Sequence, residues 1–204
     1  MKKLTYLIIV LILLMGCSNV QNVTDYKNML PTRANFEWRY SGFVGYDHVM
    51  TLNTIETQGQ TTKYLISGIV GDPSGGEAIR DFTLNIIYTL NNDSWVQEKV
   101  ETMMMDSDFN RLEILKGPIR QGAKWTQSTT NKLGALRTLV CTIDEVSMTN
   151  NLRIIKVTYQ DQASAYYEKR TIVQGKGLVA FEKLWISKDG NFPIGYALFD
   201  SGYR

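Results

Sequence analysis

The stretch Phe82-Thr83-Leu84-Asn85-Ile86-Ile87-Tyr88-Thr89-Leu90 alternates large apolar residues with mostly polar ones. Successive side chains of a β-strand point to opposite faces, so this pattern places Phe82, Leu84, Ile86, Tyr88 and Leu90 together on one buried face. An amphipathic helix would instead repeat its apolar positions every three to four residues. The stretch therefore predicts a half-buried strand, and similar alternation recurs on both sides of it.

Toward the N-terminus, Phe36, Trp38 and Tyr40 share one predicted face. Two further buried faces are expected toward the C-terminus: Leu136, Val140, Val146 and Met148 form the first, and Val179, Phe181 and Trp185 the second. Turn-forming residues separate these runs, at positions 58–60, 72–76, 91–93, 149–151 and 188–191. We predict an all-β fold of about ten strands, arranged as an antiparallel curved sheet, an open barrel or a sandwich. A short helical piece is expected at residues 25–30 or 103–110.

The N-terminal residues have the layout of a bacterial lipoprotein signal. Lys2 and Lys3 precede an apolar run that ends at Leu14-Met15-Gly16-Cys17, which resembles a lipobox. The apolar run is too short to span a membrane core, which needs about 20 residues. We therefore predict a signal peptide over residues 1–16, a lipidated tether over residues 17–35 and one β domain over residues 36–204. Lipid on Cys17 would hold the chain to a cell membrane on its extracytoplasmic side.

Charge composition limits the classes of partner. Removing residues 1–16 takes Lys2 and Lys3 from the 22 basic residues, so the remaining 20 balance the 20 acidic ones. Nucleic-acid binding usually shows as a basic excess or as basic clusters, and the longest basic stretch here is the pair Lys169-Arg170. No nucleic-acid partner is expected.

The cysteines and the histidine point away from nucleophilic catalysis. With lipid on Cys17, Cys141 is the remaining thiol, and its neighbours Leu139 to Ile143 are typical of a buried strand. A catalytic thiol would need a histidine partner, and His48 is the single histidine. Because His48 alternates with Met50 and Leu52, we interpret it as a strand histidine.

Two loops resemble catalytic or metal-binding patterns without completing them. Ser74 lies in Asp72-Pro73-Ser74-Gly75-Gly76, but the helix that follows a nucleophile elbow is lacking, so a hairpin turn is the interpretation. Residues 106–110 begin like a calcium loop, yet Arg111 stands where the loop needs glycine and Gly117 where it needs glutamate. We predict no catalytic residue, no metal site and no cofactor.

Two stretches carry a resemblance to a known group of proteins. Residues 115–125, from Leu115 through Pro118 and Gly122 to Trp125, are similar to an L-x-x-P-x-x-x-G-x-x-W pattern, and Gly175-Lys176-Gly177-Leu178-Val179 is similar to a G-x-G-L-V element. Both occur in uncharacterised, mostly Gram-positive envelope lipoproteins. The resemblance implies a scaffold role for these residues and brings no catalytic residue with it.

The expected function is that of a non-enzymatic binding or structural lipoprotein of the cell envelope. An apolar ligand is one candidate, received in a β cup lined by several of Trp38, Tyr40, Phe82, Met103, Met104 and Trp185. The run Tyr166 to Arg170 is a second place where one sheet face could bind a polar ligand, although a solvated face explains it equally well. An envelope hydrolase or other enzyme and a subunit of an envelope protein assembly remain alternatives.

Overall fold

The computed structural model describes residues 26–42, 47–72, 76–77 and 79–204. In these ranges the chain forms twelve strands: β1 (Phe36–Gly42), β2 (His48–Gln58), β3 (Thr61–Val70), β4 (Thr83–Leu90), β5 (Ser94–Val100), β6 (Arg111–Lys116), β7 (Lys124–Thr130), β8 (Leu136–Thr149), β9 (Leu152–Asp161), β10 (Tyr167–Val173), β11 (Gly177–Ser187) and β12 (Gly190–Tyr203). The all-β prediction is confirmed, and the number of strands is close to the expected ten.

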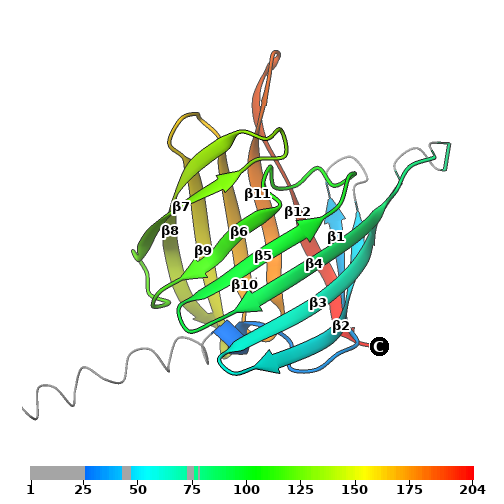
Figure 1. Ribbon diagram of the computed structural model, residues 1–204, viewed down its shortest axis with the longest axis vertical. Helices are drawn as coiled ribbons and strands as arrows, with labels where there is room; N and C mark the ends of the chain where they lie inside the picture. Colours follow the sequence, from blue (N-terminus) through cyan, green and yellow to red (C-terminus); the bar gives the residue numbers. More distant parts are fainter. Residues whose placement is uncertain (1–25, 43–46, 73–75, 78) are drawn as a thin grey trace, which may run out of the picture.

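The strands make one antiparallel sheet in the order β6-β5-β4-β3-β2-β1-β12-β11-β10-β9-β8-β7. Neighbours in the chain are neighbours in the sheet except for β6 and β7, which form its two edges, and the two halves join where β1 pairs with β12. Figure 1 shows the sheet curled until β6 and β7 face each other, so that it nearly closes into a barrel. Of the three architectures left open by the sequence, the structure is closest to the open barrel.

The alternating stretches supply the inner face of this barrel. Leu84, Ile86, Tyr88 and Leu90 are all buried, as are Phe36, Trp38 and Tyr40. Their side chains fill the interior as a single apolar cluster, in which Trp125 is 8% exposed and meets the Tyr159 ring edge-on at 6.2 Å.

The face predicted for β8 is wrong except at Val146, which packs against the core. Leu139, Cys141 and Ile143 point inward, whereas Leu136 and Met148 are 73% and 64% exposed. A one-residue shift exchanges the two faces of a strand, and both faces of β8 carry apolar residues, so alternation alone did not distinguish them. A bulge between Ile143 and Glu145 shifts the register again further along the strand.

Two strand glycines allow close approach of neighbouring backbones. A Cβ added at Gly68 would collide with the Val49 carbonyl oxygen, and one at Gly195 with the Phe181 carbonyl oxygen. Both positions therefore require glycine, which marks sites where a strand bends or its neighbour comes very near.

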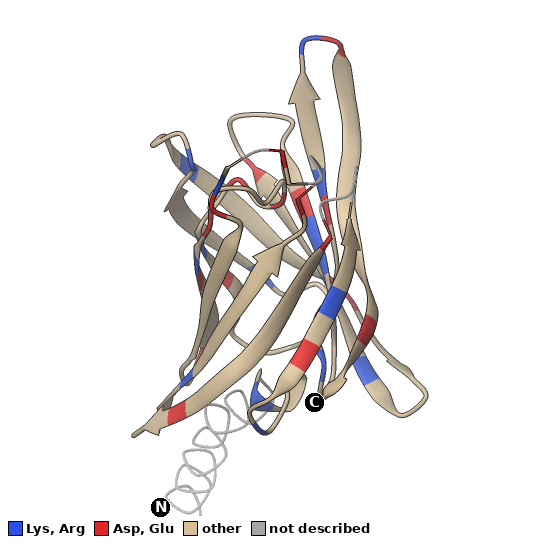
Figure 2. Cartoon of the chain, turned by 90° about the vertical axis from the view of Figure 1, so that its right-hand side faces the viewer, with Lys and Arg blue, Asp and Glu red and all other residues tan. Residues whose placement is uncertain are grey.

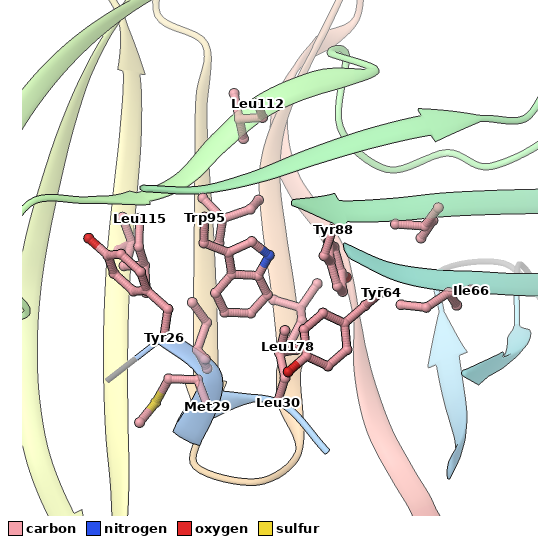
Figure 3. Close-up of a cluster of buried hydrophobic side chains, with 14 of the residues drawn as sticks. Tyr26, Met29, Leu30, Tyr64, Ile66, Tyr88, Trp95, Leu112, Leu115 and Leu178 are labelled. Atoms are coloured by element: carbon pink, nitrogen blue, oxygen red, sulfur yellow. The ribbon is translucent and has the colours of Figure 1, made fainter. Parts of the chain in front are cut away.

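One end of the barrel is closed by a helical turn at residues 26–29 and by Leu30. Figure 3 shows Tyr26, Met29 and Leu30 lying beside Trp95, Leu115 and Leu178, and each of the three is at most 1% exposed. The folded body therefore begins by Tyr26, which corrects the predicted tether over residues 17–35. The mainly polar composition of this segment masked Tyr26, Met29 and Leu30, which pack against the sheet. Of the two expected helical pieces, the one at 25–30 is found, whereas residues 103–110 form a loop.

The seam between β6 and β7 is closed by side chains. Gln127 accepts a hydrogen bond from the backbone N–H of Glu113 (2.8 Å) and donates one to the Glu113 carbonyl (3.0 Å). The Thr129 hydroxyl donates to the Arg111 carbonyl at 2.6 Å, and the Tyr159 hydroxyl reaches the Ile114 carbonyl at 2.6 Å. These bonds satisfy edge groups that a neighbouring strand would otherwise satisfy.

Candidate functional site

The end of the barrel opposite the helical turn carries the long loops and a buried polar network. The loop 101–110, between β5 and β6, folds across this end toward β10 and β11. Its Ser107 hydroxyl donates to the Glu168 carboxylate on β10 at 2.5 Å, and Asp108 pairs with Lys183 on β11 at 2.7 Å. Contacts between residues about 60 to 75 positions apart therefore hold the loop in place.

Glu168 and Arg170 form the centre of the network. Their side chains are 0% and 2% exposed, and the guanidinium donates to the carboxylate at 3.0 Å. Arg170 also contacts the Gln97 amide oxygen at 3.2 Å, and its guanidinium carbon lies 5.4 Å from the Phe181 ring centre. Burial would lower the pKa of Arg170, but the Glu168 carboxylate outweighs burial and raises it. Arg170 therefore stays a cation inside the barrel.

Tyr166 links this centre to the loop. Its hydroxyl donates to Glu168 at 2.7 Å and accepts the backbone N–H of Asp108 at 3.1 Å. Burial and the adjacent Glu168 charge raise the pKa of Tyr166 far above its usual value, so the hydroxyl keeps its proton.

A second buried cluster ties the loop to β5. Lys99 and Lys132 both pair with Asp106 and with Glu101, whose side chain is 0% exposed. Burial opposes ionisation of Asp106, but the two lysines outweigh it and hold the pKa of Asp106 below its usual value. The carboxylates that resembled the start of a calcium loop are therefore neutralised by lysines.

A cleft of about 280 Å³ opens beside the network, at the rim of the barrel. Its charged lining consists of Asp108, Arg137, Asp161 and Lys183, and its apolar lining includes Trp185. The lining residues come from the loop 101–110, from the β7–β8 connection with the start of β8, from the end of β9 with the β9–β10 connection, and from β11. The cleft thus lies where four separate parts of the chain meet.

The charges of the cleft are held in fixed positions. Asp161 accepts hydrogen bonds from the Ser164 hydroxyl (2.6 Å), from the Ala163 N–H (3.1 Å) and from Arg137. Burial opposes ionisation of Asp161, but these donors outweigh it and lower the pKa of Asp161. Lys183, already paired with Asp108, lies 5.3 Å from the Trp185 ring centre. The cleft therefore places two carboxylates and two basic side chains beside the Trp185 indole.

A larger hollow of about 370 Å³ lies on the outer surface of β8 to β11. The charged side chains there pair with one another across the strands, Lys156 with Glu145 at 2.7 Å and Lys169 with Glu182 at 3.2 Å. All four are exposed or half-exposed, so they form the solvated outer face of the sheet.

His48 and Cys141 take the structural roles that the sequence predicted. The imidazole is 2% exposed and stacks on Tyr40 with ring centres 4.4 Å apart, while Tyr196 meets it edge-on at 4.6 Å. Met50 and Leu52 are buried on the same face. Cys141 is buried, and burial raises the pKa of its thiol to about 12, which keeps it protonated and unreactive.

Other predicted positions are placed differently or lie outside the structure. Trp38, Tyr40 and Met104 are 2%, 1% and 7% exposed, so they pack the core and do not line an open cup. Trp185 is the member of that set that lines the charged cleft. Cys17 and Ser74 fall outside the described residues.

The burial of one face of the run Tyr166 to Arg170 was not predicted from the sequence. Its alternation correctly separates Tyr166, Glu168 and Arg170 from Tyr167 and Lys169, but the charged face points into the barrel. A signal was available, because Ile172 continues the same face and is fully buried.

Searches for a membrane span and a metal cluster add no further site. Within the described residues no helix is long and apolar enough to cross a membrane. In the same part of the chain no three His, Cys, Asp or Glu side chains gather as a metal site would require.

No known family matches the sequence, and no curated protein matches it either. Among solved structures, the chain is similar to a Bacteroides fragilis protein described as exported and as having a YmcC-like fold. The identity is 11%, the TM-score is 0.51, and the match covers 85% of this chain and 98% of that one. A protein from Parabacteroides distasonis described as a lipoprotein matches over the same shares at 12% identity with a TM-score of 0.45. At this identity the first likeness establishes the fold alone.

Proposed function

We propose that the chain is an envelope lipoprotein, anchored through Cys17, that binds a polar ligand carrying both charge signs in the cleft at the open end. The observation that carries this proposal is the cleft itself, where Arg137 and Lys183 stand beside Asp108 and Asp161. Binding sites combine an apolar wall with a few fixed polar groups, and Trp185 supplies such a wall here. A short peptide with free ends has the matching chemistry.

The filled interior argues against an apolar ligand inside the barrel. The side chains of Trp38, Tyr40 and Met104 are buried in the core, so they offer little surface to a ligand. The charged groups of the cleft would also have to lose water to an apolar molecule, which is unfavourable. A ligand with its own ammonium and carboxylate replaces that water with ion pairs.

Binding is also favoured over catalysis. The one Ser hydroxyl lining the cleft, that of Ser164, donates to Asp161, while His48 stacks on Tyr40 and meets Tyr196 edge-on in the core. A serine nucleophile needs a base positioned to take its proton, and a carboxylate whose pKa is lowered is a weak base.

Lipid anchoring is supported by the signal at residues 1–17 and by the likeness of the motif stretches to envelope lipoproteins. We expect Cys17→Ser to release the protein from membranes or to leave its precursor uncleaved. Mass spectrometry of the protein extracted from cells measures both outcomes. An unchanged mass together with unchanged membrane attachment would contradict the anchor.

Trp185 offers a direct test of the cleft. We expect dipeptides to change the fluorescence of the purified protein, and Trp185→Phe to abolish that change because the other three tryptophans do not line the cleft. Lys183→Met should weaken binding at least tenfold, whereas Lys169→Met, on the outer face, should leave it unchanged. Tight binding of a fatty acid, with no response to dipeptides, would overturn the proposal of a polar ligand.

A second candidate, a subunit of an envelope assembly, is favoured by the β11–β12 hairpin. Figure 1 shows this hairpin projecting beyond the other loops of the open end, and Ile186 and Phe192 on it are 50% and 42% exposed. Exposed apolar side chains on a projecting element are typical of protein contacts. Absence of any dipeptide response, together with a partner protein crosslinked through Phe192 in cells, would favour this candidate.

A further inference from the structure

Basic side chains outnumber acidic ones in the described turns at the closed end of the barrel. Backbone hydrogen bonds join the turns that meet there. The Gly117 N–H donates to the Asp93 carbonyl at 2.7 Å, and the Gly175 N–H donates to the Asn28 carbonyl at 2.9 Å. Five basic side chains occupy these turns or lie at their margin: Lys27, Arg33, Arg120, Lys124 and Lys176. In the described turns of this end, Asp93 is the one acidic residue that lies among them.

These five side chains are available for an external partner. Arg33, Arg120, Lys124 and Lys176 are exposed, and Lys27 is half-exposed. None of the five has a described acidic group within ion-pairing distance, in contrast to Arg204, which pairs with Glu37 at 3.2 Å. Arg33 packs over the Tyr203 ring at 4.1 Å, a contact that leaves its charge uncompensated.

The loops of the open end have the opposite balance. Figure 2 shows acidic segments along the upper loops, where the described acidic residues outside the lysine pairs outnumber the basic ones five to two. The acidic residues are Asp47, Asp72, Glu77, Asp81 and Asp189, and the basic ones are Arg80 and Lys188; Glu101, Asp106 and Asp108 are not counted because they pair with Lys99, Lys132 and Lys183. Opposite charges therefore face away from each other along the barrel.

We infer that the basic closed end docks onto anionic phospholipid headgroups at the surface of the membrane. The inference concerns the same membrane as the proposed lipid anchor, and that anchor adds a geometric argument. Cys17 precedes the buried Tyr26 by nine residues, which span at most about 30 Å when extended. Tyr26 is fixed at the closed end, where its hydroxyl lies 2.9 Å and 2.5 Å from the carbonyls of Asp93 and Gly117.

Proximity makes the charges effective. Attraction between exposed charges is screened beyond about 8 Å at physiological salt, so a basic patch acts on headgroups only when it is held close to them. A lipid anchor combined with a basic patch gives firmer attachment than a single signal, and it also fixes orientation. In this orientation the acidic loops and the charged cleft point away from the membrane.

The test uses lipid-free protein from residue 18 to 204, which contains every described contact. Binding is measured by co-sedimentation with vesicles of phosphatidylglycerol and phosphatidylcholine, and with vesicles of phosphatidylcholine alone. We expect binding to the anionic vesicles only, and its loss in 0.5 M salt. The triple variant K27Q/R120Q/K176Q should reduce the partition coefficient about tenfold or more.

The matched control is R80Q/K156Q/K188Q, which removes the same charge from sites away from the closed end. It should bind as the parent protein does. Equal loss in both triple variants, or equal binding to neutral vesicles, would overturn the inference, as would binding to a DNA duplex with the same dependence on the three residues. Because lipid-free protein is used, these outcomes are independent of whether Cys17 carries lipid.

Discussion

The two ends of the barrel differ in how they are held together. At the closed end, short turns and apolar side chains from residues 26–30 fill the opening, and the polar contacts are mostly to backbone carbonyls. At the open end, a long loop is tied down by buried ion pairs that involve Arg170, Lys99 and Lys183. Apolar packing tolerates small changes in geometry, whereas buried charges need every partner in place. We therefore expect the open end to be the more sensitive to single substitutions and to pH.

Removing one partner of a buried pair should have the largest effect. Arg170→Met leaves the Glu168 carboxylate buried without its cation, and we expect it to lower the free energy of unfolding by about 3–5 kcal/mol. Urea unfolding followed by circular dichroism measures the change. Glu168→Gln in the same chain should recover part of the loss, since it removes the uncompensated charge. A single variant as stable as the parent would show that Glu168 is not dependent on Arg170.

At the closed end, Leu30→Ala tests the apolar plug. Leu30 is 1% exposed, and its Cδ2 atom would lie 3.1 Å from a Cβ at Gly177, so truncation opens a cavity against β11. Such changes cost about 2–5 kcal/mol. Leu133→Ala, in an open-end loop where Leu133 is 92% exposed, is the control and should shift the thermal midpoint very little. Similar midpoints for the two variants would argue against a structural role for the helical turn.

Acidification should distinguish the two ends with a smaller effect. The pKa of Asp106 is lower in the folded protein than its usual value, so its charged form stabilises the fold above the unfolded pKa of about 3.9. This contribution is lost as the pH falls through the folded pKa. We expect the urea midpoint to drop below about pH 4, and Asp106→Asn to be less stable at pH 7 but less dependent on pH. Parallel pH profiles for parent and variant would contradict the assignment.

The same contrast explains what could be predicted from the sequence. Alternation and turn residues are local signals, and they identified the strand class and the closed-end turns, including Asn150-Asn151, where both residues adopt positive φ. The pairing of Ser107 with Glu168 joins residues 61 positions apart, and no local pattern specifies it. The plug at residues 26–30 has three apolar residues in a polar setting, too few to show a period. Charge segregation between the ends was hidden because composition reports only the neutral sum.

The seam between β6 and β7 has a consequence for the behaviour of the protein in concentrated solution. The Gln127 amide and the Thr129 hydroxyl, both on β7, occupy backbone hydrogen-bonding groups of Glu113 and Arg111 on the β6 edge. If these side-chain bonds break, the ladders between the other strands stay intact, but the backbone groups of the β6 edge become free. Free edges pair readily with those of another molecule. The Gln127 and Thr129 side chains therefore protect this edge from domain swapping and from strand-mediated aggregation.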